Sequence, residues 1–315
     1  MLKKKLSLAV PVYYEQEVIL QFLIETKEVL DSLNIEYEYV FVDDGSKDHT
    51  VQIIKEAAKT NDKIKLLVLS YNHGKAFAAT AAFTYATGDY ILYMDPDLQD
   101  PPKEIPRFLE TIEKGYDLVW GIRIEKKDSF INRLYSKIFW GTLNKYTGLA
   151  IPKGIAVMRM FTKSFAENLL AYKETNRFVE GLFMKVGMNY TTIEIEQRER
   201  FAGTTKFNFK KKMQLAFDAI FDFSELPLKF AVRLGFIFIL AGIASLILLA
   251  IEKVFFIEYQ TGWTSTISLI IIGIGVQLFF LGIVSLYIGR IYKESKNRPL
   301  FSVKEYININ KEKKQ

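Results

Sequence analysis

Two long segments toward the C-terminal end contain no charged residue, and they constrain the fold more than any other feature of the chain. Leu234–Ile251 is 18 residues long and Ser265–Gly289 is 25. At about 1.5 Å per helical residue, each can cross a hydrocarbon core of about 30 Å, the shorter one with help from its flanks. A buried core helix is the alternative, but two adjoining segments flanked by basic residues favour membrane spans. We therefore predict a transmembrane hairpin over residues 226–290, with spans at about 231–252 and 265–289.

The charges around these segments predict which side of the membrane each part occupies. The loop between them, Glu252–Thr264, is short and holds a single lysine. Basic residues lie instead on the two outer flanks, at Lys210–Lys212, Lys229, Arg233, Arg290, Lys293, Lys296 and Arg298. Because cytoplasmic loops carry an excess of Lys and Arg, both flanks are expected in the cytoplasm. We therefore expect an integral protein of the plasma membrane, with residues 1–225 and a basic tail, residues 291–315, on the cytosolic side.

The composition excludes several kinds of site and partner. The 315 residues include no cysteine, which excludes thiolate metal sites, and only two histidines, which disfavour a multi-histidine zinc site. Any metal is therefore expected to be a hard, oxygen-bound ion such as Mg²⁺ or Mn²⁺. The net charge is +6, but the basic residues lie mostly beside the hydrophobic segments, and no nucleic-acid-binding motif is present. This charge favours a membrane surface, rather than nucleic acid, as the partner.

Residues 1–225 have the pattern of a water-soluble α/β domain, in which short apolar runs alternate with amphipathic segments of helical length. The predicted strands are Leu6–Val12, Tyr39–Val42, Lys65–Leu69, Tyr90–Met94 and Asp117–Trp120. The predicted helices are Glu17–Leu33, Thr50–Lys59 and Ala76–Ala86. Continuous apolar strands alternating with helices predict a mostly parallel, Rossmann-like sheet covered by helices.

Two further stretches, near residues 130–146 and 210–223, combine an apolar helical face with basic residues. Helices of this kind often lie in the headgroup layer of a membrane. Packing onto the sheet would give the same pattern, and both alternatives stay open. The second stretch lies close to the predicted spans, which favours the membrane. We predict interfacial helices at both places.

A pair of aspartates directly follows the predicted strand Tyr90–Met94. Asp95 and Asp97 flank a proline, and Gln99 follows two residues later. In open parallel sheets ligands bind beyond the carboxyl ends of the strands, and Mg²⁺ prefers a few carboxylates plus phosphate oxygens of a substrate. An isolated Asp-x-Asp is most often a solvated turn, but its place at a strand end makes a metal site the better interpretation. We predict that Asp95, Asp97 and Gln99 bind a divalent metal.

The second predicted strand also ends in acidic residues, at Asp43 and Asp44. Gly45 permits a tight turn there, and Asp44 can accept a hydrogen bond from a base or a ribose. The simpler interpretation is a strand end followed by the N-cap of the next helix, through Ser46 or Asp48. The two interpretations are compatible.

The first predicted strand is followed by aromatic and acidic residues. Tyr13 can stack on a base. Glu15 can bind the edge of that base, or it can merely favour the start of the next helix through the helix dipole. Both residues are therefore candidates for a nucleoside site.

Several short motifs follow one another in order over nearly the whole chain. They are Pro11-Val-Tyr-Tyr-Glu15, Val42-Asp-Asp-Gly-Ser46, Asn72-His-Gly-Lys75, Ala86-Thr-Gly-Asp89, Asp95-Pro-Asp-Leu-Gln-Asp-Pro-Pro102, Gly121-Ile-Arg123, Asn176-Arg-Phe178, Arg200-Phe-Ala-Gly-Thr-Thr-Lys206 and the segment from Gly289 to Pro299. In this order they resemble glycosyltransferase family two, in its polyisoprenyl-phosphate branch. That branch includes dolichyl-phosphate mannose synthase and the bacterial bactoprenol glucosyltransferases.

The resemblance implies a GT-A fold for residues 1–225 and a hexosyltransferase activity. The expected donor is a nucleotide-sugar, the acceptor is a polyisoprenyl phosphate such as undecaprenyl phosphate, and the transfer takes place at the cytosolic membrane face. A UDP-hexose is the expected donor, because the tail resembles the bacterial enzymes more than the mannose synthases. Relatives form homotetramers through the hairpin and tail, so a homo-oligomer is also implied.

The resemblance also implies roles for individual residues. Donor binding is assigned to Pro11, Tyr13, Glu15, Asp44, Lys75 and Asp95. The metal is assigned to Asp95, Asp97 and Gln99. Catalysis is assigned to Asp97 together with residues positioned to grip phosphates, which are Arg123, Arg200 and Lys206. Guanidinium groups suit phosphates because they donate two parallel hydrogen bonds.

Two positions depart from the family pattern. Tyr14 stands where Asn is common, which is a mild change. Val157 stands where many relatives have an aspartate assigned to catalysis. A phosphate monoester has its second pKa near 6 and is largely a dianion at pH 7, so it needs no general base. Val157 therefore fits a lipid-phosphate acceptor better than a hydroxyl acceptor, with metal and charge as the catalytic device.

Two other functions are weighed against this one. A processive polysaccharide synthase carries Gln-x-x-Arg-Trp on an interfacial helix, and Gln197-Arg-Glu-Arg200-Phe201 comes close. However, Thr191–Glu196 alternates like a strand, and two spans are too few for a polymer channel. A pseudo-glycosyltransferase scaffold that binds nucleotide-sugar without transferring it is supported only by Val157. The intact metal motif counts against the scaffold.

Overall fold

The computed structural model describes residues 4–124, 141, 144, 148–149, 151–198, 226–255 and 263–309. The chain divides into two compact units, Met1–Ala216 together with Pro299–Gln315, and Phe217–Arg298. Arg200, Lys206 and the predicted interfacial segment 210–223 lie outside the described residues, as does segment 130–146 apart from residues 141 and 144.

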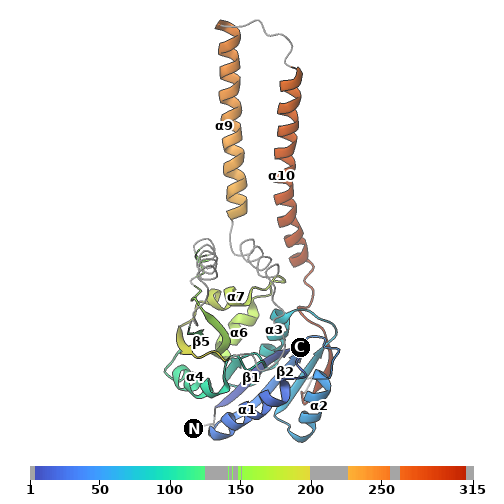
Figure 1. The fold of residues 1–315 in the computed structure, drawn as a ribbon, viewed down its shortest axis with the longest axis vertical. Helices are drawn as coiled ribbons and strands as arrows, with labels where there is room; N and C mark the ends of the chain where they lie inside the picture. Colours follow the sequence, from blue (N-terminus) through green and yellow to red (C-terminus); the bar gives the residue numbers. More distant parts are fainter. Residues whose placement is uncertain are drawn as a thin grey trace. The chain divides into compact units, whose positions relative to one another are not determined.

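An eight-stranded sheet forms the centre of the first unit (Figure 1). Its strands are β1 (Lys5–Val12), β2 (Glu36–Asp43), β3 (Ile64–Leu69), β4 (Tyr90–Tyr93), β5 (Leu118–Arg123), β6 (Ile155–Thr162), β7 (Tyr190–Ile195) and β8 (Val303–Ile307), in the order β7-β5-β6-β4-β1-β2-β3-β8. The pairs β1–β2, β1–β4, β2–β3 and β5–β7 are parallel, whereas β6 and β8 pair antiparallel with their neighbours. The mostly parallel sheet predicted from the sequence is confirmed.

Helices cover both faces of this sheet. They are α1 (Ile19–Ser32), α2 (Thr50–Thr60), α3 (Lys75–Tyr85), η1 (Pro102–Glu104), α4 (Ile105–Ile112), α6 (Lys163–Ala171) and α7 (Val179–Lys185). Side chains alternate between the faces of a strand. Accordingly, Leu8 and Val10 of β1 pack into one core with Phe22 of α1. On the other face, the ring of Phe83 from α3 packs edge-on against that of Phe161 from β6.

Two strands were not predicted from the sequence, β6 and β8. In β6 the apolar run is interrupted by Arg159, which is nevertheless 1% exposed. Its guanidinium carbon lies 4.6 Å from the ring centroid of Trp120 and 4.8 Å from that of Phe183, so aromatic faces surround the cation. In β8 the short alternating sequence lies within the predicted tail, and it pairs with β3. An ion pair of 2.7 Å joins Glu305 of β8 to Lys55 of α2.

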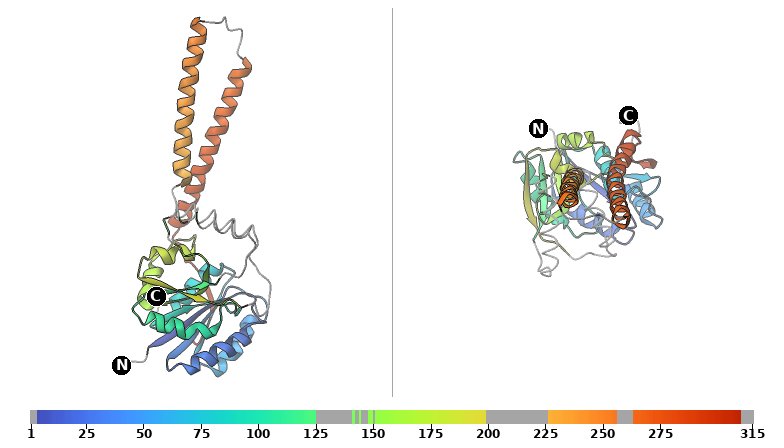
Figure 2. Two further views of the ribbon diagram at one scale, coloured as in Figure 1. Left: turned by 60° about the vertical axis from the view of Figure 1, so that its left-hand side comes forward. Right: turned by 90° about the horizontal axis from the view of Figure 1, so that it is seen from above.

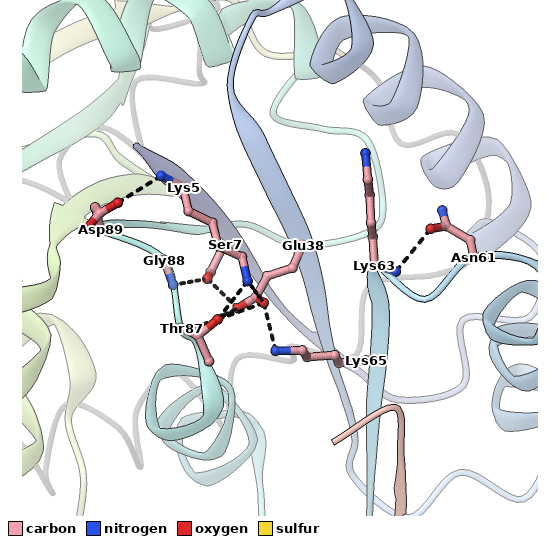
Figure 3. A network of polar contacts seen from close by, with 9 residues as sticks. All are labelled: Lys5, Ser7, Glu38, Asn61, Lys63, Lys65, Thr87, Gly88 and Asp89. Atoms are coloured by element: carbon pink, nitrogen blue, oxygen red, sulfur yellow. Dashed lines mark hydrogen bonds and ion pairs between the residues drawn. The ribbon is translucent and has the colours of Figure 1, made fainter. Parts of the chain in front are cut away.

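A buried carboxylate ties the amino ends of the central strands together (Figure 3). Glu38 of β2 is 2% exposed. Its Oε2 accepts from Lys5 Nζ at 2.5 Å and from Lys65 Nζ at 2.7 Å, and its Oε1 accepts from Ser7 Oγ and from the backbone N–H of Thr87, both at 2.7 Å. One side chain therefore joins β1, β2, β3 and the segment that leads into β4, at the amino ends of the strands.

The second unit contains two long apolar helices, α9 (Leu226–Phe255) and α10 (Trp263–Ser295), which run alongside each other (Figure 2). The windows Pro227–Ala244 and Ile272–Ser295 have mean hydropathies of 1.8 and 2.0, and none of their residues is buried. Both helices are long and apolar enough to cross a membrane. The predicted spans fall within them, and their insertion into a bilayer stays a prediction.

Candidate functional site

The predicted site residues of the described part follow neighbouring strands. Strands β4, β1, β2 and β3 lie side by side in parallel, so their carboxyl ends meet at one edge of the sheet. The backbone N–H of Asp44 donates to the carbonyl of Val12 at 3.0 Å, and that of Met94 donates to the carbonyl of Ala9 at 3.3 Å. These bonds fix the starts of two loops, one with Asp44 and one with Asp95, on either side of β1.

Asp44 clamps the loop that leads into α3. Its Oδ1 accepts from the backbone N–H of His73 at 2.7 Å, and its Oδ2 accepts from that of Gly74 at 2.9 Å. Burial raises the pKa of Asp44, while these two N–H groups act in the opposite direction. Each carboxylate oxygen has two lone pairs, so Asp44 can still accept from a ribose or a base. The predicted donor-binding residue is thus also a structural one.

Gly45 occupies a backbone position that other residues tolerate poorly. Its φ is +80°, and a Cβ atom there would lie 2.9 Å from the backbone N of Asn72 and 2.9 Å from the backbone carbon of Tyr71. The β2 loop and the β3 loop therefore approach closely at Gly45, beside the clamp made by Asp44. The tight turn predicted at this position is confirmed.

Replacement of Gly45 by Ala is expected to weaken nucleotide binding about tenfold or more, because the added methyl group pushes away the loop that Asp44 holds. The expected loss of stability is about 2–4 kcal/mol, which combines left-handed strain with overpacking. Gly115→Ala is the matched control, since Gly115 has φ +98° but nothing within 4 Å of its added Cβ. The control should lose only about 1 kcal/mol and bind UDP normally. Equal UDP affinities for the two variants, measured by calorimetry, would show that the close approach is unimportant.

The segment after β1 begins α1 and leaves aromatic rings beside the Asp44 loop. The backbone carbonyl of Glu15 accepts from the N–H of Ile19 at 3.2 Å, but no acidic side chain lies in the first turn of α1, so the helix-dipole role predicted as an alternative for Glu15 is not supported. Tyr13 and Tyr14 pack edge-on with centroids 4.5 Å apart. Tyr14 has φ +56°, a left-handed conformation in which Asn is enriched. The position at which the family commonly has Asn is therefore one that favours Asn for its backbone. Pro11 is buried within β1.

The Asp95–Gln99 loop is held by a leucine in an uncommon conformation. Leu98 has φ +58° and is 2% exposed, so its side chain reaches the core while its backbone turns the loop. Oδ1 of Asp97 accepts from the backbone N–H of Gln99 at 3.2 Å. Strained backbone of this kind is common where function requires an exact geometry. Sequence reasoning did not single out Leu98.

The chemistry of this loop fits a hard divalent cation. Asp95, Asp97 and Gln99 offer only carboxylate and amide oxygens. A cationic group already sits on one of them, because Lys75 Nζ donates to Asp95 Oδ2 at 2.5 Å. Among the described residues no group of three or more His, Asp or Glu side chains forms a complete metal cage. Side-chain oxygens of this kind suit Mg²⁺, which proteins often bind through one or two carboxylates while substrate phosphates and water complete the coordination.

Asp100 connects the Asp95–Gln99 loop to Arg123, and sequence reasoning missed this role. Its Oδ1 accepts from Arg123 Nε at 3.2 Å and from Nη2 at 3.1 Å. Its Oδ2 accepts from the backbone N–H of Met158 on β6 at 3.0 Å. Arg123, predicted to bind phosphates, is therefore held beside the Asp95–Gln99 loop. Val157, the position where relatives have an acid, directly precedes Met158 in β6 and so lies one residue away from this contact.

Comparison with known proteins identifies similar chains. The family model described as Glycosyl transferase family 2 matches residues 7–170. Uncharacterized glycosyltransferase YkcC of Bacillus subtilis is 36% identical, over 96% of this chain and 94% of its own length. Undecaprenyl-phosphate 4-deoxy-4-formamido-L-arabinose transferase of Proteus mirabilis is 31% identical, over 98% of this chain and 96% of its own.

One solved structure illustrates the more distant similarities. Glucosyl-3-phosphoglycerate synthase from Mycobacterium tuberculosis, in complex with Mn²⁺ and uridine-diphosphate-glucose, matches 68% of this chain and 75% of its own at 14% identity. The TM-score is 0.49. A likeness at this level carries no conclusion about ligands of the present chain.

Proposed function

The chain belongs to glycosyl transferase family 2 and is a glycosyltransferase, and on this premise we propose that it transfers a hexose from a nucleotide-sugar to the phosphate of a polyisoprenyl lipid. The proposed donor is a UDP-hexose and the proposed acceptor is undecaprenyl phosphate. The proposed place is the cytosolic face of the plasma membrane, with α9 and α10 as the membrane anchor.

The main support for this proposal is the arrangement of residues at one edge of the sheet. The clamp made by Asp44 and the oxygen-bearing loop of Asp95 flank the end of β1, and Asp100 holds Arg123 beside that loop. This arrangement offers separate places for a nucleoside, a metal and a phosphate. The transferase of Proteus mirabilis, 31% identical over 98% of this chain, is named for undecaprenyl phosphate, which supports the same acceptor here.

The proposed reaction is a single displacement that balances without a protein base. An oxygen of the lipid phosphate forms a bond to the anomeric carbon of the sugar, and the bond from that carbon to the donor diphosphate breaks. The electron pair leaves with the nucleoside diphosphate. No proton has to be removed from the acceptor, because a phosphate monoester is largely a dianion at pH 7.

The protein contributes binding and charge to this reaction. Pro11, Tyr13, Glu15 and Asp44 would hold the nucleoside. Asp95, Asp97 and Gln99 would hold Mg²⁺ or Mn²⁺, which neutralises charge on the departing diphosphate. Arg123 would bind a phosphate, oriented by its two hydrogen bonds to Asp100. Arg200 and Lys206 are proposed to bind further phosphate oxygens.

Replacement of Val157 by Asp is expected to leave the rate with lipid phosphate unchanged or to lower it. The new carboxylate has no proton to remove, and it adds negative charge at the residue before Met158, whose backbone N–H binds Asp100, in a site proposed to hold a dianionic acceptor. Val157→Asn controls for size and polarity without charge. A gain of about tenfold, or about 1.4 kcal/mol, in kcat/KM for Val157→Asp alone would show that an acid is missing from this chain.

The membrane part of the proposal concerns insertion and assembly. We expect α9 and α10 to span the bilayer as a hairpin, with residues 1–225 and 291–315 in the cytoplasm, and the full chain to form a homo-oligomer, a tetramer by resemblance. Protease protection in right-side-out vesicles tests the orientation. Cleavage within residues 1–225 by protease added outside intact vesicles would contradict the proposed orientation.

One assay separates the proposed function from its two alternatives. Purified full-length chain is incubated with labelled nucleotide-sugars, Mg²⁺ and undecaprenyl phosphate. A labelled lipid monosaccharide supports the proposal, and a long polymer indicates a processive synthase. Donor binding without any product indicates a scaffold.

A further inference from the structure

The ion pair between Lys75 and Asp95 occupies part of the proposed metal site. Lys75 Nζ lies 2.5 Å from Asp95 Oδ2. The side chain of Asp95 is 21% exposed and that of Lys75 is 45% exposed, so the pair lies at an opening rather than in the core. An ammonium group bound at Asp95 Oδ2 repels a divalent cation that approaches the same carboxylate, because the two positive charges lie only a few ångströms apart. A metal ion that binds Asp95 therefore competes with the Lys75 ammonium group for the charge of this carboxylate.

The backbone of Lys75 is fixed, which limits where the released ammonium group can go. Lys75 is the first residue of α3, and Gly74 before it has φ +104°. The N–H groups of His73 and Gly74 both donate to Asp44. The root of the lysine side chain is thus tied to the residue proposed to hold the nucleoside. A diphosphate that extends from that nucleoside toward the metal offers oxygens within the region that the side chain reaches.

We propose that the Lys75 ammonium group pairs with Asp95 in the absence of donor and pairs with the donor diphosphate once the donor binds. Metal and nucleotide therefore bind tightly only together. The inference rests on the proposed function, since it takes Asp95 as a metal ligand and a nucleoside diphosphate as part of the donor. Lys75 acts as a positioning residue. Without nucleotide it competes with the metal, and with nucleotide it exchanges a carboxylate for a phosphate.

Coupling between two ligands is reciprocal. The factor by which UDP tightens Mn²⁺ binding must equal the factor by which Mn²⁺ tightens UDP binding. Removal of the Lys75 charge should lower this factor for two reasons. Mn²⁺ no longer competes with an ammonium group at Asp95, and UDP no longer gains an ammonium group as a partner. A purely structural role of Lys75 would weaken the binding of both ligands instead.

The test is a titration of Mn²⁺ into the full-length chain in detergent, with free Mn²⁺ measured by electron paramagnetic resonance. Wild type and Lys75→Met are compared without nucleotide, with UDP and, separately, with GDP. The methionine keeps an unbranched side chain and a high helix propensity while removing the charge. Lys75→Met is expected to bind Mn²⁺ about fivefold tighter than wild type without nucleotide, the upper range for an exposed ion pair. The tightening of Mn²⁺ binding by UDP should be weaker in the variant by at least the same factor.

Two control variants isolate the ion pair from general charge. Lys75→Arg retains the cation and should behave as wild type without nucleotide. Lys103→Met removes a lysine that lies close in sequence to the metal loop but pairs with Glu196 at 3.7 Å, and it should leave Mn²⁺ binding unchanged. Circular dichroism confirms that each variant is folded, and Lys75→Gln replaces Lys75→Met if the latter is not.

The inference is overturned if Lys75→Met binds Mn²⁺ no tighter than wild type without nucleotide, or if Lys103→Met tightens it equally. The wild-type titrations alone can also overturn the inference. Equal Mn²⁺ affinities without nucleotide, with UDP and with GDP would exclude any coupling between metal and nucleotide. Sugar transfer by wild type without the Lys75 effect would leave the proposed function standing and remove only this inference. The Lys75 effect without any sugar transfer would remove the proposed function and leave the competition at Asp95.

Discussion

Asp97→Ala is expected to lower sugar transfer by at least about 100-fold, with the protein still folded. Asp97 is 9% exposed, and its Oδ1 accepts a hydrogen bond from the backbone N–H of Gln99, so its carboxylate is held in place as a proposed metal ligand. With Val157 in place of an acid, no other acid–base group is assigned to the reaction, and in the proposed mechanism metal-assisted departure of the diphosphate would supply most of the rate. Loss of a metal ligand removes several kcal/mol of charge stabilisation, and each 1.36 kcal/mol corresponds to tenfold in rate.

The measurement is the initial rate of labelled lipid formation at saturating Mn²⁺. Asp62→Ala, at an exposed turn before β3, serves as the matched control and should retain the wild-type rate. Asp97→Asn tests whether shape without charge is sufficient, and it should be nearly as inactive as Asp97→Ala. Turnover of Asp97→Ala within a few fold of wild type would contradict the proposed metal-assisted mechanism.

Glu38→Ala is expected to destabilise the first unit by about 3 kcal/mol, the lower end of the range for a broken buried ion pair. The substitution leaves the ammonium groups of Lys5 and Lys65 and the N–H of Thr87 without their acceptor. Their side chains are 31% and 19% exposed, so water partly replaces the lost carboxylate. For a domain of this size the melting temperature should fall by about 6–12 °C. Glu36→Ala, at an exposed position of the same strand, should change it little.

The same carboxylate makes stability depend on pH. Burial acts to raise the pKa of Glu38, but the hydrogen bonds from Lys5, Lys65, Ser7 and Thr87 outweigh it and lower the pKa from 4.5 to about 2. A carboxylate with a lowered pKa stabilises the fold above its ordinary pKa, and this contribution is lost as the pH falls from about 4.5 toward 2. Wild type should therefore lose stability over this range more steeply than Glu38→Gln. Parallel acid titrations of the two proteins would show that the network is unimportant.

The position of the Asp95–Gln99 loop could be predicted from the sequence, because the carboxyl ends of parallel strands lie at the same edge of a sheet. The apolar runs before Asp44 and before Asp95 became β2 and β4, which flank β1. The turn at Gly45 was equally readable, since a glycine after a strand indicates a backbone that side chains would obstruct. These features depend on local pattern and one topological rule.

The contacts that organise the site could not be predicted, because they join segments that are distant in sequence. The hydrogen bonds that Asp100 accepts from Arg123 and from the backbone N–H of Met158 depend on β6 lying antiparallel between β4 and β5. That strand was not predicted because Arg159 interrupts its apolar run, and the sequence does not reveal that aromatic rings surround this charge. The ion pair of Lys75 with Asp95 likewise depends on how two loops meet, and the sequence alone gives no distance between them.

The most direct test of the account compares two acceptors that differ only in the phosphate. The full-length chain is incubated with labelled UDP-hexoses and Mn²⁺, and with either undecaprenyl phosphate or undecaprenol. The account predicts label in the lipid fraction, as one hexose per lipid, with undecaprenyl phosphate alone, since only the phosphate provides an oxygen that is already ionised at pH 7. Equal transfer to undecaprenol, or no labelled lipid with any nucleotide-sugar while Mn²⁺ and nucleotide still bind, would contradict it.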